Sequence, residues 1–251
     1  MLHPTLAFLG SFADAINFIF HKQEAQLGGV EVGGPAQCWD FALEQLKVTA
    51  YALGVALAIA LPTGIILGYR GGGELLAVAI GNAGRAIPEL ALIAFLVAFI
   101  GTGVLNLTIA LSVLGIPPIL TNAFVAMRQV DRGTIDAARG MGMRPWEVIA
   151  RVQLPLAVPT IMAGVRTAAT AIVATATIAP LASVLTLGDF ILSRNVYGDE
   201  GVLAGAILVA ALALLIEAVL AGLQWLLTPK PMRSLPLWER RPGFTSALRS
   251  E

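Results

Sequence analysis

Long apolar stretches, separated by short polar ones, make up most of the chain. The apolar stretches run from about Leu46 to Tyr69, Leu75 to Ile100, Val104 to Met127, Leu156 to Val184 and Val202 to Leu227. Each is long enough for an α-helix to cross a hydrocarbon core of about 30 Å, which takes about 20 residues. The pattern therefore predicts an all-α polytopic membrane protein with about five transmembrane helices.

The segment before the first span is less apolar than the spans. Residues 1–22 are interrupted by Ser11, Asp14 and Asn17, which favours an amphipathic helix in the membrane interface over a spanning helix. If that segment inserts instead, the number of spans rises to six. A glycine-rich polar linker is predicted from Gly28 to Gly34.

Prolines and glycines predict irregularities within the spans. Pro88 should kink or break the second span, and Pro117 with Pro118 should disturb the third. Gly201 and Gly205 form a GxxxG motif at the start of the fifth. Such a motif is compatible with a dimer face, but a glycine-rich membrane chain contains it for other reasons too.

The composition supports a membrane protein and narrows its chemistry. The chain is 57% hydrophobic and 13% charged, with formal net charge zero, so nothing indicates nucleic acid. A single cysteine, Cys38, excludes an intrachain disulfide and a cysteine-based metal cluster. Both histidines, His3 and His21, lie near the N-terminus, which argues against an intramembrane hydrolase. No metal or cofactor is predicted.

The basic residues predict the orientation of the chain. The polar loop between the third and fourth spans holds Arg128, Arg132, Arg139, Arg144 and Arg151. The C-terminal tail is also basic, whereas the N-terminal segment and the loop before the fifth span are rich in acidic residues. The positive-inside rule places the arginine-rich loop and the C-terminus in the cytoplasm and the N-terminus outside, as five spans require.

The arginine-rich loop contains the longest polar passage of the apolar region, VDRGTIDAARGMGMRPWEVIARVQLP, from Val130 to Pro155. Asp131 or Thr134 can cap a first short helix, which Gly140 and Gly142 should end.

A second short helix is predicted to follow in the same loop. Pro145 suits its first turn, and Pro155 should end it. The loop is therefore predicted to form a rigid helix–glycine–helix module of the kind that fits a groove on another protein.

The module resembles the EAA loop of ABC importer permeases. The family pattern is Glu-Ala-Ala, three residues, Gly, nine residues and Ile-x-Leu-Pro. This chain has Asp136-Ala137-Ala138, Gly142 at the required spacing, and Val152-Gln153-Leu154-Pro155. The departures, Asp for Glu and Val for Ile, keep the charge and the apolar character. The resemblance implies a type I ABC importer permease fold.

Further stretches resemble the osmoprotectant branch of these permeases, which imports glycine betaine, choline or carnitine. They are IPELALIAFLVAFIGTG, from Ile87 to Gly103, and the block from Pro117 to Ala169. Permeases for methionine, phosphonate and oxyanions share the EAA loop, so another small solute remains an alternative.

The resemblance also implies partners and a division of labour. No GxxxxGK[ST] stretch is present, so the chain has no Walker A loop and is not predicted to be an enzyme. Separate ATPase subunits would dock on the coupling loop, residues 128–155, through Asp136, Ala137, Ala138, Gly140, Gly142, Leu154 and Pro155. A second permease subunit, identical or paralogous, and an extracytoplasmic solute-binding protein would complete the transporter.

The chain is predicted to have three regions and a membrane location. Residues 1–45 form an interfacial helix and an extracytoplasmic linker, residues 46–227 the transmembrane permease domain, and residues 228–251 a cytoplasmic tail. The expected location is the inner membrane of a bacterial or archaeal cell, as a multi-pass protein in contact with lipid.

A few polar residues within the last two spans are candidates for the solute pathway. Arg166 can snorkel to the cytoplasmic interface or close a cytoplasmic gate. Thr170, Thr175 and Thr177 can line a polar path, although the alanine-rich span around them also fits plain tight packing. Glu217 can serve in a path or form a hydrogen bond between helices.

A secondary transporter driven by an ion gradient is the rival class. It would need intramembrane carboxylates and usually an internal repeat. Glu89 and Glu217 are the only carboxylate candidates, and no repeat is visible. Arg85 lies four residues before Glu89, a spacing that permits pairing, but Pro88 between them disfavours it.

Overall fold

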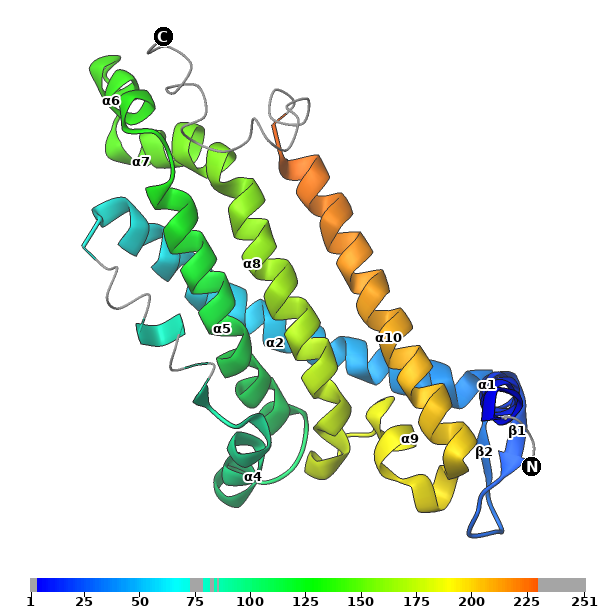
Figure 1. Cartoon of the computed structure of the whole chain (residues 1–251). Coiled ribbons are helices and arrows are strands. Elements are labelled where there is room, and N and C mark those ends of the chain that lie inside the picture. Colours follow the sequence, from blue (N-terminus) through cyan, green and yellow to red (C-terminus); the bar gives the residue numbers. More distant parts are fainter. Residues whose placement is uncertain (1–3, 73–78, 82–83, 85, 230–251) are drawn as a thin grey trace. The chain divides into compact units, whose positions relative to one another are not determined.

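The computed structural model describes residues 4–72, 79–81, 84 and 86–229 (Figure 1). These residues form two compact units. The first consists of the described parts of Met1–Ala56, Arg85–Gly115 and Ala169–Glu217, and the second of those of Leu57–Gly84, Ile116–Ala168 and Ala218–Glu251.

Apart from turns, loops and one small hairpin, the described residues are helical. The α-helices are α1 (Pro4–Phe20), α2 (Gly34–Arg70), α4 (Glu89–Ile100), α5 (Val104–Arg128), α6 (Arg132–Gly140), α7 (Pro145–Val148), α8 (Leu154–Thr175), α9 (Gly188–Leu192) and α10 (Arg194–Leu227). A π turn, η1 (Ile149–Gln153), precedes α8, and a 3₁₀ helix, η2 (Ala176–Ala182), follows it. The strands are β1 (Lys22–Glu24) and β2 (Glu31–Gly33).

Among the described residues, four helical stretches are long and apolar enough to cross a membrane. They are α2, α5, the stretch Pro145–Ala182 that contains α8, and α10. They match four of the five predicted spans. Of the predicted second span, the half after Pro88 is the shorter apolar helix α4. Residues 73–78, 82–83 and 85 lie outside the described residues, and so does the disfavoured pairing of Arg85 with Glu89.

The predicted glycine-rich linker is an antiparallel hairpin instead. β1 and β2 pair with Lys22 opposite Gly33, and Gly28 and Gly29 turn the tip with positive φ. The backbone N–H of Gly33 donates to the side-chain oxygen of Gln37 at 2.6 Å. α2 therefore begins at Gly34, well before the predicted first span.

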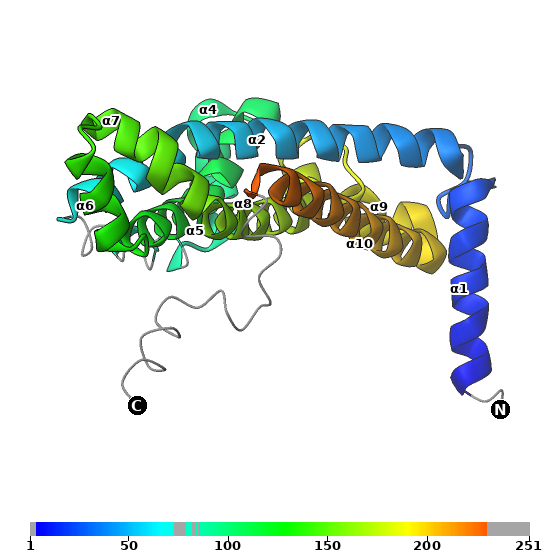
Figure 2. The same ribbon diagram turned by 90° about the horizontal axis from the view of Figure 1, so that it is seen from above.

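Aromatic side chains hold the N-terminal part of the first unit together. Phe190 of α9 is fully buried and meets the rings of Phe18 and Tyr197 edge-on, at centroid distances of 5.4 and 4.9 Å. α1 lies across the N-terminal end of α2 within this unit (Figure 2).

The GxxxG motif of α10 packs inside the chain. A Cβ at Gly201 would lie 3.3 Å from the ring of Phe18, and one at Gly205 would lie 2.8 Å from the Cβ of Phe190. The two glycines let α9 and α1 approach α10 closely, so this motif is occupied within the chain and is not a free dimer face.

Small residues also bring helices together in the second unit. A Cβ at Gly64 of α2 would lie 2.7 Å from the Cβ of Ala123 in α5, and one at Gly164 of α8 would lie 2.5 Å from the Cβ of Asn122. α5 runs unbroken through Pro117 and Pro118, so the predicted irregularity there is wrong. The amide of Asn122 donates to the carbonyl of Pro118 at 2.8 Å, which occupies an acceptor in this stretch of the helix.

The predicted fourth span does not stay α-helical up to Val184. α8 tightens into η2 at Ala176, and Ser183 with a φ of 60° ends the helical stretch. The amide of Gln45 donates to the carbonyl of Val173 at 3.1 Å, and the hydroxyl of Thr186 to that of Ala176, also at 3.1 Å. These two side chains therefore supply hydrogen-bond donors to backbone carbonyls where the α-helix changes to a 3₁₀ helix.

Candidate functional site

Asp131 caps the first helix of the polar loop, α6. Its carboxylate accepts hydrogen bonds from the backbone N–H of Thr134 at 2.8 Å and from the Thr134 hydroxyl at 3.1 Å. Of the two predicted caps, Asp131 is therefore the cap and Thr134 is its partner.

Gly142 ends α6. It has a φ of 83°, its N–H donates to the carbonyl of Arg139 at 2.9 Å, and the N–H of Met143 donates to that of Ala138 at 3.3 Å. This pair of bonds is a Schellman motif, whose left-handed position favours glycine. Gly140 is the last residue of α6, has no positive φ, and has open space where a Cβ would stand. Only one of the two predicted helix breakers therefore ends the helix.

The second helix of the loop, α7, begins at Pro145 as predicted. The side chain of Glu147 accepts a hydrogen bond from the backbone N–H of Arg144 at 2.8 Å, and it pairs with Arg151 at 3.8 Å. The first turn of α7 is thus fixed from both directions.

Pro155 does not end this helix, contrary to the prediction. The N–H of Leu154 bonds to the carbonyl of Ile149, so η1 widens the helix by one residue per turn just before Pro155. A π turn accommodates a proline because it shifts the hydrogen-bond register where an N–H is missing. α7, η1 and α8 consequently form one continuous stretch, which connects the loop rigidly to a membrane span.

The two alanines of the Asp-Ala-Ala sequence lie in different environments. Ala138 is 2% exposed, whereas Ala137 and Asp136 are exposed. The loop also exposes two large apolar side chains, Met141 at 72% and Trp146 at 57%. The module therefore offers apolar side chains and a carboxylate on its surface, over an interior fixed by its caps.

Arg166 joins α8 to α10 within the second unit. Its guanidinium donates to the side-chain oxygen of Gln224 at 2.8 Å, and the amide of Gln224 lies 3.5 Å from the carbonyl of Pro159. Gln224 was not among the predicted site residues, although a polar side chain near the end of an apolar span is a visible signal in the sequence.

The predicted threonines differ in what they contact. Thr175 is buried and its hydroxyl donates to the carboxylate of Glu89 in α4 at 3.2 Å, whereas Thr177 bonds to the carbonyl of Ala174 in its own helical stretch. Thr170 and Glu217 are partly buried in the same unit. The structure thus brings Glu89 next to Thr175, one of the threonines predicted to line a path.

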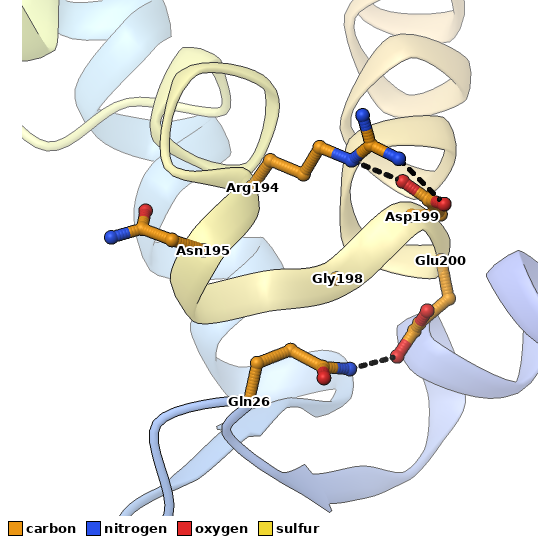
Figure 3. Close-up of a pocket in the computed structure, with 6 residues that line it drawn as sticks. All are labelled: Gln26, Arg194, Asn195, Gly198, Asp199 and Glu200. Carbon is orange, nitrogen blue, oxygen red and sulfur yellow. Dashed lines mark hydrogen bonds and ion pairs between the residues drawn. The ribbon is translucent and has the colours of Figure 1, made fainter.

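One open pocket of about 590 Å³ lies in the first unit (Figure 3). Arg194 pairs with Asp199 through two contacts, at 2.5 and 2.9 Å, and Gln26 donates to Glu200 at 3.3 Å. These pairs bracket Gly198, whose φ of 68° kinks the start of α10. The pocket lining therefore fixes the kink and the hairpin.

The fold and the loop define an all-helical, multi-pass membrane protein that presents a rigid polar module next to its spans. Residues 60–230 match the family described as the binding-protein-dependent transport system inner membrane component. The chain belongs to this family, and it is the permease subunit of an ABC transporter, as distinct from the ATPase.

Relatives agree with this assignment, and a solved structure shares the fold. The carnitine transport permease protein OpuCB of Listeria monocytogenes is 39% identical over 189 residues, 75% of this chain and 86% of the relative. The choline transport system permease protein OpuBB of Bacillus subtilis (strain 168) is 34% identical over 193 residues, 76% of this chain and 89% of the relative. The fold is similar to a chain of the inward-facing MetNI methionine ABC transporter, with a TM-score of 0.66, 22% identity, and coverage of 77% of this chain and 97% of that one.

Proposed function

We propose that this chain is the membrane pathway of an ABC importer for compatible solutes such as glycine betaine, choline or carnitine. The loop of residues 128–155 is its coupling element, and α6 docks on a separate ATPase. A second permease subunit and a solute-binding protein on the outer face complete the transporter. The N-terminus lies outside and the basic C-terminal tail in the cytoplasm.

The observation that carries the coupling role is the construction of the loop. Asp131 and the Schellman turn at Gly142 fix both ends of α6, and the π turn continues α7 into α8. A partner shifts the balance between two conformations of the transporter only if it binds one of them more tightly than the other. A rigid module passes that contact to the span, whereas a flexible loop would absorb it.

The surface of the loop supports docking on a protein. Met141 and Trp146 are exposed in a segment whose arginines predict a cytoplasmic location. Exposed Trp and Met at the centre of a polar rim are typical of binding sites for partner proteins.

The names of the relatives support the solute. The chain is similar to permeases named for carnitine, for choline, and for glycine betaine, carnitine and choline, at 39%, 34% and 32% identity. The tryptophans, Trp39, Trp146, Trp225 and Trp238, are spread along the chain, so no aromatic cage is expected within the permease. Selection of the solute therefore rests mainly with the separate binding protein.

Reconstitution tests this proposal. The permease is placed in liposomes with the ATPase and the solute-binding protein encoded beside it, and uptake of labelled glycine betaine, choline, methionine and molybdate is measured. We expect ATP-dependent uptake of the first two and negligible solute binding by the purified permease alone. Uptake of methionine or molybdate without betaine or choline would refute the solute and leave the permease assignment intact.

A further inference from the structure

Glu89 lies at an unusual place, at the start of an apolar helix that runs beside η2. α4 begins with Glu89 directly after Pro88, and the Thr175 hydroxyl donates to the Glu89 carboxylate at 3.2 Å. At the other end of the helix, the N–H of Gly103 donates to the carbonyl of Ala182 at 2.8 Å. α4 and η2 therefore run side by side in the same direction between these two contacts.

The length of α4 places the carboxylate deep in the membrane. Its 12 residues rise about 18 Å at about 1.5 Å per residue. With the predicted orientation, which puts the turn Gly101–Gly103 at the outer edge of the span, and with α4 along the membrane normal, we infer that Glu89 lies beyond the middle of a hydrocarbon core of about 30 Å.

The helix periodicity points Glu89 toward the protein and away from lipid. Ile93 and Val97, four and eight residues further on, face the core, and Ile93 is 2% exposed. The exposed residues Phe95 and Phe99 lie on the opposite side of α4. Glu89 continues the packed stripe by one turn, yet it is exposed.

An exposed carboxylate on the protein-facing stripe needs water or a ligand beside it. Thr175, which is 9% exposed, occupies one carboxylate oxygen, and within the described residues the other, Oε1, accepts no hydrogen bond. A charge at this depth is costly in hydrocarbon and typically faces an aqueous cavity. The partial positive charge at the N-terminus of α4 favours a carboxylate there.

We propose that Glu89, positioned by Thr175, is a specificity-determining residue of the translocation path and favours solutes that carry a quaternary ammonium group. A quaternary ammonium cannot donate an N–H hydrogen bond, so a carboxylate attracts it through charge alone. A single carboxylate without an aromatic cage holds such a group weakly, which permits release along a path. This inference rests on the proposed function.

Thiol labelling tests the aqueous position. In a Cys38→Ser background, Glu89→Cys and Phe95→Cys are compared in the reconstituted transporter with a charged, impermeant thiol reagent, with and without ATP. We expect labelling at position 89 in one of these states and none at position 95, on the opposite side of α4. Failure to label position 89 in either state, while a cysteine at exposed Val30 reacts, would refute the inference.

Transport tests the preference for cations. Glu89→Gln keeps an acceptor for Thr175 and removes only the charge. We expect uptake of choline, a cation, to fall about tenfold, and uptake of glycine betaine to fall less because its own carboxylate offsets the attraction. Glu44→Gln, which neutralises a carboxylate that pairs with Lys47 near the start of α2, serves as the matched control and should transport like the wild type.

Thr175→Val is expected to lower choline uptake less than Glu89→Gln does, because it disturbs only the position of the carboxylate. Thr63→Val removes a hydroxyl that bonds to the carbonyl of Ile59 in its own helix and is the control. If the wild type takes up both solutes normally, and Glu89→Gln lowers choline and betaine uptake equally or not at all, this inference is refuted and the proposed function stands. No wild-type uptake of either solute would refute the proposed function as well.

Discussion

The guanidinium of Arg166 donates a 2.8 Å hydrogen bond to the side-chain oxygen of Gln224, and this contact links α8 to α10 within the second unit. The amide of Gln224 also lies 3.5 Å from the carbonyl of Pro159. Gln224 of α10 thus contacts both the guanidinium of Arg166 and the backbone carbonyl of Pro159, which belong to α8. These two contacts hold α8 and α10 in register. Sequence analysis left Arg166 between a snorkelling and a gating role, and this contact favours a role between helices.

A double-mutant cycle tests that role. Gln224→Leu, Arg166→Met and the double variant are compared by thermal unfolding in detergent. Because one partner is charged, we expect a coupling of about 1–2 kcal/mol between the two positions. Gln224→Glu retains an acceptor and should keep most of the stability. Additive effects of the two single changes would contradict a direct link.

The two glycines at the end of α6 give a matched pair for the coupling loop. Gly142→Ala forces an alanine into a φ of 83°, which costs about 1–2 kcal/mol, whereas Gly140→Ala is placed in a helix with open space around its Cβ. We expect Gly142→Ala to lower solute-stimulated ATP hydrolysis and transport more strongly than Gly140→Ala does. The measurements are ATPase activity and uptake in proteoliposomes at equal permease content. Equal behaviour of the two variants would show that the turn does not transmit coupling.

Loss of the Asp131 cap is expected to destabilise α6 less than Gly142→Ala does. Asp131→Ala removes both hydrogen bonds to Thr134 and should destabilise α6 by about 1 kcal/mol. Thr134→Val keeps the backbone bond and should cost less. Hydrogen exchange of the α6 amides measures both, and faster exchange in Thr134→Val than in Asp131→Ala would contradict the assignment of the cap.

Cysteine labelling in intact cells tests the orientation. In a Cys38→Ser background, cysteines at Val30 and Asp199 should react with an impermeant thiol reagent, and a cysteine at Arg144 should react only after the membrane is opened. Val30 is chosen because it is 64% exposed, whereas a Cβ at the neighbouring Gly33 would lie 2.7 Å from the carbonyl of Phe18. Labelling of position 144 from outside would reverse the orientation and remove the coupling role.

The sequence predicted most of the helical architecture because hydrophobic length reports directly on the membrane. The helix containing Val104–Met127 was placed to within a residue of its end. The cap, the turn glycine and the starting proline of the loop were also within reach, since each depends on local chemistry at Asp131, Gly142 and Pro145.

The features that were not predicted rest on a local adjustment of the backbone, on strands too short to show a pattern, or on a tertiary contact. Pro155 ends a helix by local rules, yet the preceding π turn lets the helix continue. The Gly28–Gly34 segment looked like a linker because three-residue strands are too short to show an alternating pattern. The sequence suggested Arg85 or a coupled ion as the partner of Glu89. Its contact with Thr175 could not be predicted, because the two residues lie 86 positions apart in the chain.

The exposed apolar side chains of the loop give the last prediction, on the ATPase surface. Trp146 is 57% exposed and Met141 72%, in a loop that the positive-inside rule predicts to be cytoplasmic. Truncation of a tryptophan at the centre of an interface typically costs about 2 kcal/mol or more, so Trp146→Ala should weaken ATPase binding by at least about tenfold. Met141→Ala should have a smaller effect in the same direction.

Trp39 offers the matched control for that experiment. It is 64% exposed, similar to Trp146, but lies near the start of α2, on the side assigned to the outside. Binding of the purified ATPase to permease variants in nanodiscs is measured by surface plasmon resonance. The thermal stability of each variant is measured in parallel. We expect Trp39→Ala to bind like the wild type and Trp146→Ala to dissociate faster at unchanged stability. Normal ATPase binding by a folded variant that carries both Trp146→Ala and Met141→Ala would place the docking surface elsewhere on the chain.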